Sequence, residues 1–395
     1  MKDKQPKHLE IILKVSERCN LNCSYCYVFN MGSDLALNSA PVISRATINS
    51  LKNFLERSVR EYSIDVIQID LHGGEPLMLK KERMAVLCAL IREGDYNGAS
   101  VQIGIQTNAT LIDEEWIEIF SRYHVSVSIS IDGPKHVNDI HRLDHQGRSS
   151  YEKTLRGYKL LSTRSTDGKK EINAPVLSVL TPKANGSELF SHLYDVMGCR
   201  NFDFLLPDCN YDNPIDTAAI GRSLIEICDK WYAQNDPDCV VRIVNAHMAH
   251  LAGNKKNVVL GVTNVNKNAL ALAFTVTSQG EIYVDDTLRS THSDIFTSIG
   301  NITHTSLEEI FASRQLIALN IIQDTIPREC SECVWRNICA GGRPINRYSS
   351  IDGFTGKTIY CDAMKMFLGR CASILNEMGV SIEELVINLG IENDK

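Results

Sequence analysis

Short apolar runs and helical segments alternate along the first half of this chain, and this alternation most limits the folds it can adopt. The runs are rich in β-branched or aromatic residues and end at Gly, Asn, Pro or charged residues, as buried strands do. They are LEIILKV (9–15), VIQIDL (66–71), VQIGIQ (101–106), VSVSISI (125–131), VLSVL (176–180) and FDFLL (202–206). Between them, segments such as 44–62 and 112–122 have apolar residues at helical spacing.

Strands that alternate with helices predict βαβ units and a parallel sheet. Six units are too few to close an eightfold barrel, so we expect an α/β fold with a partial (β/α)6, TIM-like barrel over residues 1–214. The carboxyl ends of the strands are where chemistry gathers in such a sheet. Residues 215–270 predict a helical bridge of two helices around NDPDC.

The remaining residues, 271–395, predict a smaller C-terminal domain. It starts with a hairpin, FTVTSQGEIYVDD, that turns at Gly280, and it continues with a helix at 306–319 and a C-terminal helix from about 362. A cysteine-dense loop lies between these two helices. A domain of this size needs more than apolar area to hold such a loop, which suggests a metal group.

Composition limits the class of protein. The net charge of −7 argues against a nucleic-acid partner, which usually requires a basic surface. No stretch approaches the roughly 18–20 apolar residues of a membrane span, and the N-terminus MKDKQPKHLE lacks the apolar core of a signal peptide. We therefore expect a cytoplasmic protein that binds no membrane. Its thirteen cysteines then indicate metal or catalytic sites rather than disulfides.

Three cysteines follow the first predicted strand, in SERCNLNCSYCYVFN. Cys19, Cys23 and Cys26 have C-x3-C-x2-C spacing on a loop at the carboxyl end of that strand. A structural zinc site takes four protein ligands, commonly in paired C-x2-C knuckles. Three thiolates on one loop suit a [4Fe–4S] cluster that leaves one iron without a protein ligand. A zinc knuckle is the alternative reading.

This loop resembles that of the radical SAM enzymes, in which S-adenosylmethionine (AdoMet) binds the open iron. HGGEP (72–76), QTNAT (106–110), SISIDGP (128–134) and NDIHRLD (138–144) resemble further segments of that family, in the same order. The resemblance implies AdoMet contacts at Tyr25, Gly73, Gly74, Glu75, Asn108, Ser130, Arg142 and Leu180.

The implied roles differ among these residues. Tyr25 would lie against the adenine, with Leu180 nearby, and Glu75 or adjacent carbonyls would accept hydrogen bonds from the AdoMet ammonium. Asn108 and Ser130 would contact the ribose and methionine ends, although both residues also suit ordinary turns. Arg142 would pair with the AdoMet carboxylate, unless it is a solvated surface charge. We take the histidines of these segments, His72, His141 and His145, as structural or surface residues.

A second cysteine cluster lies in the C-terminal domain. Cys330, Cys333 and Cys339 have C-x2-C-x5-C spacing, and Cys361 follows twenty-two residues later. The pattern resembles the SPASM domain of radical SAM enzymes that modify peptides. The resemblance implies one auxiliary [4Fe–4S] cluster on these four cysteines. Zinc is the alternative for four thiolates, and Cys371 is the rival for the fourth position.

A full SPASM domain carries two auxiliary clusters, and this chain lacks the residues for one of them. Arg343 stands where the motif continues with a cysteine, and Asp285 stands where the hairpin would carry one. The other cysteines are isolated in sequence and are interpreted as packing thiols: Cys88, Cys199, Cys209, Cys228 and Cys239.

The chain also resembles the maturases that form three-residue cyclophanes, and most of all the Xye-type enzymes of Xenorhabdus, Yersinia and Erwinia. This resemblance rests on the single auxiliary site and on the segments GEIYVDDTLR and CAGGRPINRYS. The resemblance implies a C–C bond between an aromatic ring and the β-carbon of a residue two positions later in a ribosomal precursor peptide. It also implies a leader on that peptide and a reductant such as flavodoxin or ferredoxin. The auxiliary cluster could accept an electron from the substrate radical.

Asp286 matches the position of an aspartate proposed as the base in SPASM sulfatase maturases, and we expect it on a strand close to the turn. An exposed hairpin carboxylate is the alternative. A maturase that forms formylglycine or thioethers is the second enzymatic reading, and an iron–sulfur carrier or a zinc adaptor is the non-enzymatic one. The short N-terminal segment predicts that leader recognition uses the barrel, the bridge or a separate protein.

Overall fold

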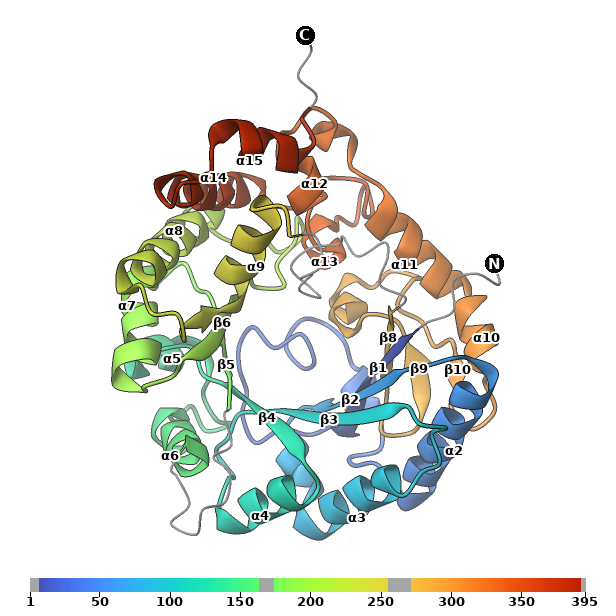
Figure 1. Ribbon diagram of the computed structural model, residues 1–395. Helices are drawn as coiled ribbons and strands as arrows, with labels where there is room; N and C mark the ends of the chain where they lie inside the picture. The colour runs from blue at the N-terminus through green and yellow to red at the C-terminus, as the bar shows by residue number, and fades with distance from the viewer. Residues whose placement is uncertain (1–6, 163–173, 255–270, 392–395) are drawn as a thin grey trace. The chain divides into compact units, whose positions relative to one another are not determined.

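All six strands predicted from the sequence form, and helices follow them along the chain (Figure 1). The computed structural model describes residues 7–162, 174–254 and 271–391. The strands are β1 (His8–Ser16), β2 (Val66–Gly73), β3 (Ser100–Thr107), β4 (Val125–Ser130), β5 (Val176–Val179) and β6 (Asn201–Leu205). Among the described residues, no helix combines the length and the hydropathy needed to cross a bilayer.

Two units make up the chain. The first consists of Met1–Ile131, Asn138–Ala174 and Lys267–Leu319. The second consists of Asp132–Val137, Pro175–Asn266 and Asn320–Lys395. The predicted hairpin thus belongs with the first unit rather than with the C-terminal residues. The predicted domain ranges stay a prediction.

The sheet of the first unit has the strand order β10-β9-β8-β1-β2-β3-β4. β1 to β4 are parallel, as predicted, and β8 (Ala271–Val276) also runs parallel to β1. β9 (Glu281–Tyr283) and β10 (Gly300–Asn301) are antiparallel additions at the edge. The hairpin therefore extends the same sheet, because β8 pairs with the strand that precedes the three-cysteine loop.

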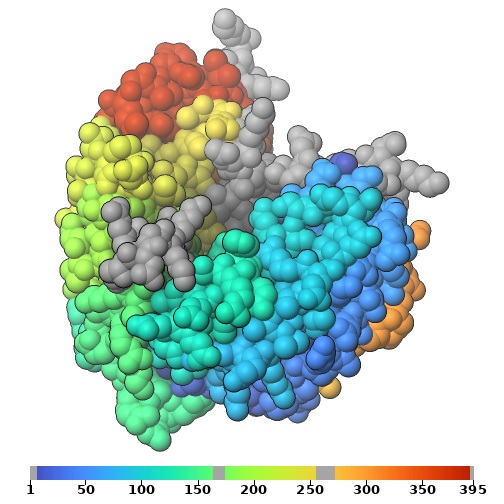
Figure 2. Space-filling model, turned by 60° about the horizontal axis from the view of Figure 1, so that its bottom comes forward, coloured from blue at the N-terminus to red at the C-terminus, as the bar shows by residue number. Residues whose placement is uncertain are grey.

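One face of this sheet is apolar and covered by helices. Leu9, Ile11 and Leu13 of β1 are fully buried, and Phe54 of a covering helix meets Phe274 of β8 edge to face at 6.1 Å. The helical segments between the end of β1 and residue 162 are α1 (Leu35–Asn38), α2 (Arg45–Glu61), η1 (Pro76–Leu79), α3 (Lys81–Arg92), α4 (Glu114–Arg122), α5 (Lys135–His141) and α6 (Tyr151–Ser162). Figure 2 shows the blue to cyan side chains of this layer from outside.

The other face of the sheet is polar. Side chains alternate between the faces of a strand, so Glu10 and Lys14 of β1 point away from the apolar layer. Asp70 and His72 of β2 do the same, and Lys14 is the register partner of His72. The runs predicted as buried strands are thus apolar on one face only, whereas their polar positions face the interior of the partial barrel.

The second unit contains β5 and β6 with the short β7 (Val240–Val241), all parallel. Its first helices are α7 (Gly186–Ser191), η2 (His192–Val196), α8 (Thr217–Gln234) and α9 (Arg242–Leu251). Its C-terminal part contains η4 (Arg328–Cys330), α12 (Arg336–Cys339), α13 (Pro344–Arg347), α14 (Cys361–Glu377) and α15 (Ile382–Leu389). α14 packs closely on α8. A Cβ added at Gly221 of α8 would lie only 2.9 Å from the Cα of Ala363 in α14.

Two of the predicted helical segments differ in how well they match the structure. The two helices around NDPDC form as α8 and α9, and the rest of that segment, 255–270, lies outside the described residues. The single helix predicted at 306–319 is wrong, because the structure has α10 (Leu307–Phe311) and α11 (Arg314–Asp324) instead. Ser313 separates them: its hydroxyl donates to the Ile310 carbonyl at 2.7 Å and accepts from the Leu316 N–H at 3.3 Å.

Candidate active site

The three-cysteine loop begins where β1 ends, at the carboxyl edge of the first unit's sheet. Cys19, Cys23 and Cys26 are partly exposed. The loop is ordered by local hydrogen bonds: the Cys26 N–H donates to the Cys23 carbonyl at 2.9 Å, and the Asn30 side chain donates to the same carbonyl at 2.8 Å. The Leu21 N–H donates to the Cys19 sulfur at 3.3 Å.

Two glycines at the end of β2 and directly after it hold the start of this loop. The Gly74 N–H donates to the Ser16 carbonyl at 2.8 Å, and the Glu75 N–H donates to the Arg18 carbonyl at 2.9 Å. A Cβ at Gly73 would lie 2.0 Å from the Ser16 oxygen, and one at Gly74 would lie 2.4 Å from the Arg18 oxygen. Gly73 also has a φ of +143°. Glycine is therefore required for this close approach of two backbones.

The Glu75 carboxylate connects the ends of β2 and β3. One oxygen accepts from the Leu77 N–H at 3.0 Å and from the Thr107 hydroxyl at 2.7 Å, and the other accepts from the Asn108 N–H at 2.8 Å. Glu75 is only 1% exposed. Burial raises its pKa above the ordinary value, and these three hydrogen bonds partly offset that rise. The side chain thus organises the site, and its contact with an AdoMet ammonium stays a prediction.

Asn108 connects the end of β3 to the cysteine loop. Its amide donates to the Asn20 side-chain oxygen at 2.9 Å, and Asn20 donates to the Thr110 hydroxyl at 2.7 Å. Thr110 closes the ring by donating to the Asn108 side-chain oxygen at 2.7 Å. Asn108 is therefore more than a turn former, because its side chain fixes the residue next to Cys19.

The end of α5 and the residues after it also contact the cysteine loop. Arg142 donates to the Tyr25 hydroxyl at 2.8 Å and is 6% exposed, so it is not a solvated surface charge. The His141 ring lies 2.6 Å from the Ser24 hydroxyl, and the His145 ring lies 2.9 Å from the Cys19 carbonyl. Both histidines thus contact the cysteine loop, and their assignment as structural or surface residues stays a prediction.

Two further predicted AdoMet contacts, Ser130 and Leu180, belong to different units. Ser130, the last residue of β4, accepts a hydrogen bond from the Gln106 side chain at 2.7 Å on the polar face of the sheet. Leu180 follows β5 in the second unit, where its N–H donates to the Leu205 carbonyl at 2.9 Å. The other predicted contacts, Tyr25, Gly73, Gly74, Glu75, Asn108, Ser130 and Arg142, all belong to the first unit.

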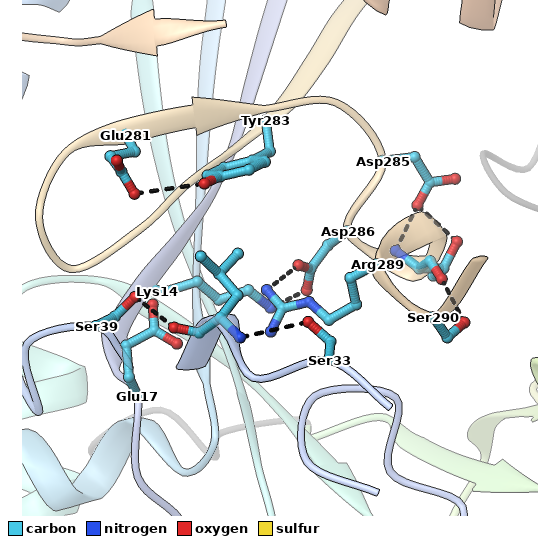
Figure 3. A network of polar contacts seen from close by, with 12 residues as sticks. Lys14, Glu17, Ser33, Ser39, Glu281, Tyr283, Asp285, Asp286, Arg289 and Ser290 are labelled. Atoms are coloured by element: carbon cyan, nitrogen blue, oxygen red, sulfur yellow. Dashed lines mark hydrogen bonds and ion pairs between the residues drawn. The ribbon is translucent and has the colours of Figure 1, made fainter. Parts of the chain in front are cut away.

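Asp286 does not lie on a strand, and that expectation is wrong. It is the first residue of η3 (Asp286–Thr291), because the Asp285 carboxylate accepts from the Thr287 N–H at 2.9 Å and starts a helical turn directly after β9. It is also not an exposed carboxylate. Asp286 is 2% exposed and forms ion pairs with Lys14 and with Arg289 (Figure 3).

This network lies against the residue that follows Cys26. The Lys14 ammonium is 5.6 Å from the ring centre of Tyr27, and the Arg289 guanidinium is 6.0 Å from it. Burial acts to raise the pKa of Asp286, but Arg289 and Lys14 more than offset this and hold its pKa well below the ordinary value. Asp286 is thus an anion that binds a proton weakly.

The four C-terminal cysteines line one cavity of the second unit. They are Cys330, Cys333, Cys339 and Cys361. Cys371 does not line that cavity: it is fully buried, and its sulfur lies 3.7 Å from that of Cys228. Burial and the neighbouring Cys330 raise the pKa of Cys339 to about 12. Thiols in such a cluster repel each other as anions, so the cavity suits a cationic group among them.

Arg343 occupies the position where the motif would continue with cysteine. Its guanidinium pairs with Asp208 at 2.9 Å, and Asn346 donates to the Cys209 carbonyl at 2.8 Å. These contacts hold the loop after β6. Cys209 is half-buried, whereas the other isolated cysteines, Cys88, Cys199, Cys228 and Cys239, are buried as expected of packing thiols.

The cysteine sites differ from single-ion sites. Within the described residues, no three His, Cys, Asp or Glu side chains converge on one metal ion. Tetrahedral zinc with Zn–S bonds of about 2.3 Å would bring the sulfurs to about 3.8 Å from each other. A four-iron cluster needs its ligands farther apart. Zinc and a four-iron cluster therefore require different spacings of the cysteine sulfurs.

Sequence reasoning missed several residues of the site. Asn20 and Thr110 are polar residues within the motifs, and Gln106 ends a predicted strand. Lys14 and Arg289 were also missed. The signal for Lys14 was a lysine inside the apolar run LEIILKV, which in a parallel sheet places a charge in the barrel interior.

Known proteins resemble this chain over almost its full length. Residues 13–183 match the sequence profile of the Radical SAM superfamily. The cysteine-type anaerobic sulfatase-maturating enzyme of Clostridium perfringens is 23% identical over 377 residues, which cover 91% of this chain and 95% of that enzyme.

Solved structures show the same fold. Native anSMEcpe with bound AdoMet and Cp18Cys peptide has a TM-score of 0.78 at 22% identity, over 94% of this chain and 99% of that one. SuiB of Streptococcus suis, bound to its precursor peptide SuiA, has a TM-score of 0.59 at 16% identity, over 91% of this chain and 76% of that one. The chain thus has the radical SAM α/β fold with a partial, barrel-like parallel sheet, as predicted.

Proposed function

We propose that this chain, with its radical SAM fold, is a maturase that uses AdoMet to modify a peptide or protein substrate. One observation carries the proposal: three cysteines of a single loop are fixed by hydrogen bonds to the segments that follow β2, β3 and α5. A loop held this way would offer its three thiolates to one cluster. A separate four-cysteine cavity in the second unit adds a second cluster site.

The residues present fit both clusters. Cys19, Cys23 and Cys26 would hold a [4Fe–4S] cluster with an open iron, and the four cysteines of the second unit would hold a closed one. When bound, the first cluster would supply the electron that cleaves AdoMet to a 5′-deoxyadenosyl radical, which removes a hydrogen atom from a substrate C–H bond. The second would supply electron transfer.

The protein's own residues would position the reactants. Arg142 would pair with the AdoMet carboxylate, and its bond to the Tyr25 hydroxyl would set the ring beside the adenine. Asn108 and Ser130 would contact the ribose and methionine ends. Asp286 would take the proton that the substrate releases, and its low proton affinity suits a strongly acidic substrate intermediate.

The product we propose is a three-residue cyclophane, in which an aromatic ring carbon of a precursor peptide is joined to the β-carbon two residues later. This reaction removes two hydrogens from the peptide. Two observations support it: the Arg343–Asp208 ion pair stands where a second auxiliary site would need cysteine, and the hairpin has Asp285 at its corresponding position. The peptide bound to the SuiB structure supports a peptide substrate.

Formylglycine formation is the second candidate. The matched Clostridium enzyme is a cysteine-type sulfatase-maturating enzyme, and the anSMEcpe structure holds the Cp18Cys peptide. Such a reaction oxidises a Cys or Ser side chain to an aldehyde instead of joining two residues. It would use the same cysteine loop and the same Asp286.

The test starts with anaerobically purified, reconstituted protein. We expect about eight irons per chain from two four-iron clusters, and release of 5′-deoxyadenosine with AdoMet and dithionite. Co-expression with the short open reading frames beside the gene should yield a peptide lighter by two hydrogens. A colourless protein with one zinc and no 5′-deoxyadenosine would overturn the proposal.

Two readouts separate the products. A cyclophane resists fragmentation between the joined residues in tandem mass spectrometry and does not react with a hydrazide. A formylglycine fragments normally and forms a hydrazone. The Cys23→Ala variant should abolish both 5′-deoxyadenosine and product, whereas Cys88→Ala, which changes a packing thiol of α3, should retain both.

A further inference from the structure

Basic side chains line the cavity that the four C-terminal cysteines share. Arg336, Lys357 and Lys365 contribute to its wall together with these cysteines. The described residues that line the cavity include no Asp or Glu. Cysteine binds a metal as the thiolate, so a metal group in this cavity would be held by four anionic ligands among three cationic side chains.

The backbone of Lys357 is fixed at the wall of this cavity. Its carbonyl accepts from the Tyr211 hydroxyl at 3.0 Å, and the N–H of Thr358 donates to the Gly341 carbonyl at 2.8 Å. Gly341 and Thr358 both line the cavity. Within the described part of the chain, no carboxylate forms an ion pair with Lys357. Its positive charge is therefore not neutralised by a described acidic side chain.

Arg336 is tied to the loop that carries two of the cysteines. Its guanidinium donates to the Ser331 carbonyl at 2.5 Å, and Ser331 lies between Cys330 and Cys333 in the chain. Like Lys357, Arg336 has no ion pair with a carboxylate of the described residues. The hydrogen bond thus keeps an uncompensated positive charge beside this loop.

A fourth cation lies buried behind the wall of the cavity. Arg347 is 1% exposed, and its guanidinium donates to the carbonyls of Gly356 at 3.0 Å and Ile322 at 2.9 Å. A Cβ at Gly341, which lines the cavity, would lie 3.9 Å from an Arg347 nitrogen. No described carboxylate pairs with Arg347, although a buried charge is costly without an opposite charge. A negatively charged group in the cavity would supply that opposite charge.

Lys365 is the weakest of the cations that line the cavity. Its ammonium lies 3.9 Å from the Asp362 carboxylate, and both side chains are exposed. The carboxylate offsets part of the charge, and water and salt screen the rest. We therefore expect Lys365 to affect a group in the cavity less than Lys357 does.

We propose that Lys357, Arg336 and Arg347 favour the one-electron-reduced form of a [4Fe–4S] cluster held by the four C-terminal cysteines. The inference rests on the proposed function, because it assumes that these cysteines hold the second cluster. Gain of an electron makes the cluster and its thiolates more negative by one charge. Nearby cations stabilise the more negative state more strongly, and they thereby raise the reduction potential of the cluster.

A raised potential gives this cluster a direction of electron flow in the proposed reaction. After the adenosyl radical has removed a hydrogen atom and the C–C bond has formed, the peptide must still lose one electron and one proton to restore its aromatic ring. The electron would reduce the second cluster, and a one-electron carrier of the flavodoxin or ferredoxin class would reoxidise it. The three cations touch no reacting atom in this scheme, and they act only through the charge of the cluster.

The test isolates the second cluster. Cys23→Ala removes a ligand of the first cluster, so the reconstituted full-length chain with this change should hold about four irons. A dithionite titration followed by electron paramagnetic resonance then gives the midpoint potential. Adding Lys357→Gln should lower the equilibrium constant for reduction by about tenfold, which is about 59 mV for a one-electron couple. Arg336→Gln should shift the potential in the same direction.

Matched variants separate charge from shape. Lys357→Arg and Arg336→Lys keep the positive charge and should titrate like the Cys23→Ala parent. Lys230→Gln removes an exposed lysine of α8 that does not line the cavity, and it should also titrate like the parent. Unchanged potentials in both Lys357→Gln and Arg336→Gln would overturn the inference. So would equal shifts in the charge-conserving variants, because these would show an effect of shape.

Arg347 is read by iron content as well as by potential, because it is buried. Arg347→Lys keeps the charge without the planar guanidinium, and it should keep the potential of the parent. Arg347→Met removes the charge and should lower the potential of the iron that it retains. The variants of Lys357 and Arg336 decide the inference whether or not Arg347→Met folds.

The outcomes separate the inference from the proposed function. A Cys23→Ala protein that binds zinc in place of iron would refute the second cluster, and the inference with it. An iron-loaded protein whose potential does not respond to the charges of Lys357 and Arg336 would refute the inference alone, because the proposed function does not depend on these side chains.

Discussion

Replacing Asp286 by asparagine should destabilise the first unit strongly, because it leaves buried cations without a full counter-charge. Lys14 is 0% exposed, Arg289 is 2% exposed, and both pair with this one carboxylate. Glu17, also buried, adds an acidic side chain to the network but has no ion pair with either cation among the described contacts (Figure 3). The asparagine keeps a single carbonyl oxygen for two cations.

The magnitude follows from the cost of breaking a buried ion pair. Removing one partner of such a pair costs about 3–5 kcal/mol, since the other charge stays buried. We would measure the effect by amide hydrogen exchange, because a chain of several units need not unfold in one transition and a single unfolding curve would then give no defined free energy. The slowest amides of β1 should exchange more than about a hundredfold faster in Asp286→Asn, because each 1.4 kcal/mol is a factor of ten.

The neighbouring carboxylate provides the control. Asp285 caps η3 through the Thr287 N–H, and asparagine caps a helix about as well as aspartate does. Asp285→Asn should therefore leave β1 exchange within about twofold of wild type. If Asp286→Asn exchanges like Asp285→Asn, the two cations do not depend on Asp286, and the assignment of this network is refuted.

The same network predicts a dependence of stability on pH. The folded-state pKa of Asp286 lies well below its ordinary value. Its contribution is therefore fully present above the unfolded-state pKa of about 3.9, and it is lost as pH falls from there toward the folded-state pKa. Wild type should lose protection of the β1 amides below about pH 4, whereas Asp286→Asn should lack this part of the pH dependence.

Three further changes test other parts of the site. Gly73→Ala should abolish AdoMet binding by equilibrium dialysis, because its Cβ would lie 2.0 Å from the Ser16 oxygen at a φ of +143°; binding at wild-type affinity would contradict the close approach. Cys361→Ser should lower bound iron by about half, whereas Cys371→Ser should keep the wild-type iron content. Arg142→Lys should weaken AdoMet binding by about tenfold through loss of the planar guanidinium, and an unchanged Kd would remove Arg142 from the site.

The parallel sheet was predictable because its signals are local. Each strand run is bounded by turn formers, and the alternation with helices leaves few topologies. The pairing of β8 with β1 was not predictable, because it joins residues about 260 positions apart in sequence and depends on tertiary packing. The break at Ser313 was missed because helical spacing continues on both sides of it.

The site was predicted in part for similar reasons. Motif residues such as Glu75 and Asn108 lie at strand ends, where parallel sheets place functional groups. The roles of their side chains could not be read from spacing, because each is decided by partners such as Thr107 or Asn20 from other segments. Asp286 was expected on a strand, since the Asp285 cap that turns the chain into η3 depends on one hydrogen bond.

The contacts around the three-cysteine loop bear on how the enzyme matures. Residues 141–145 and the ends of β2 and β3 contact this loop through hydrogen bonds. Ordering a free loop costs about 1–2 kcal/mol per residue, and these contacts supply part of that free energy. A cluster that binds here would therefore spend less of its own binding free energy on holding the three cysteines in place.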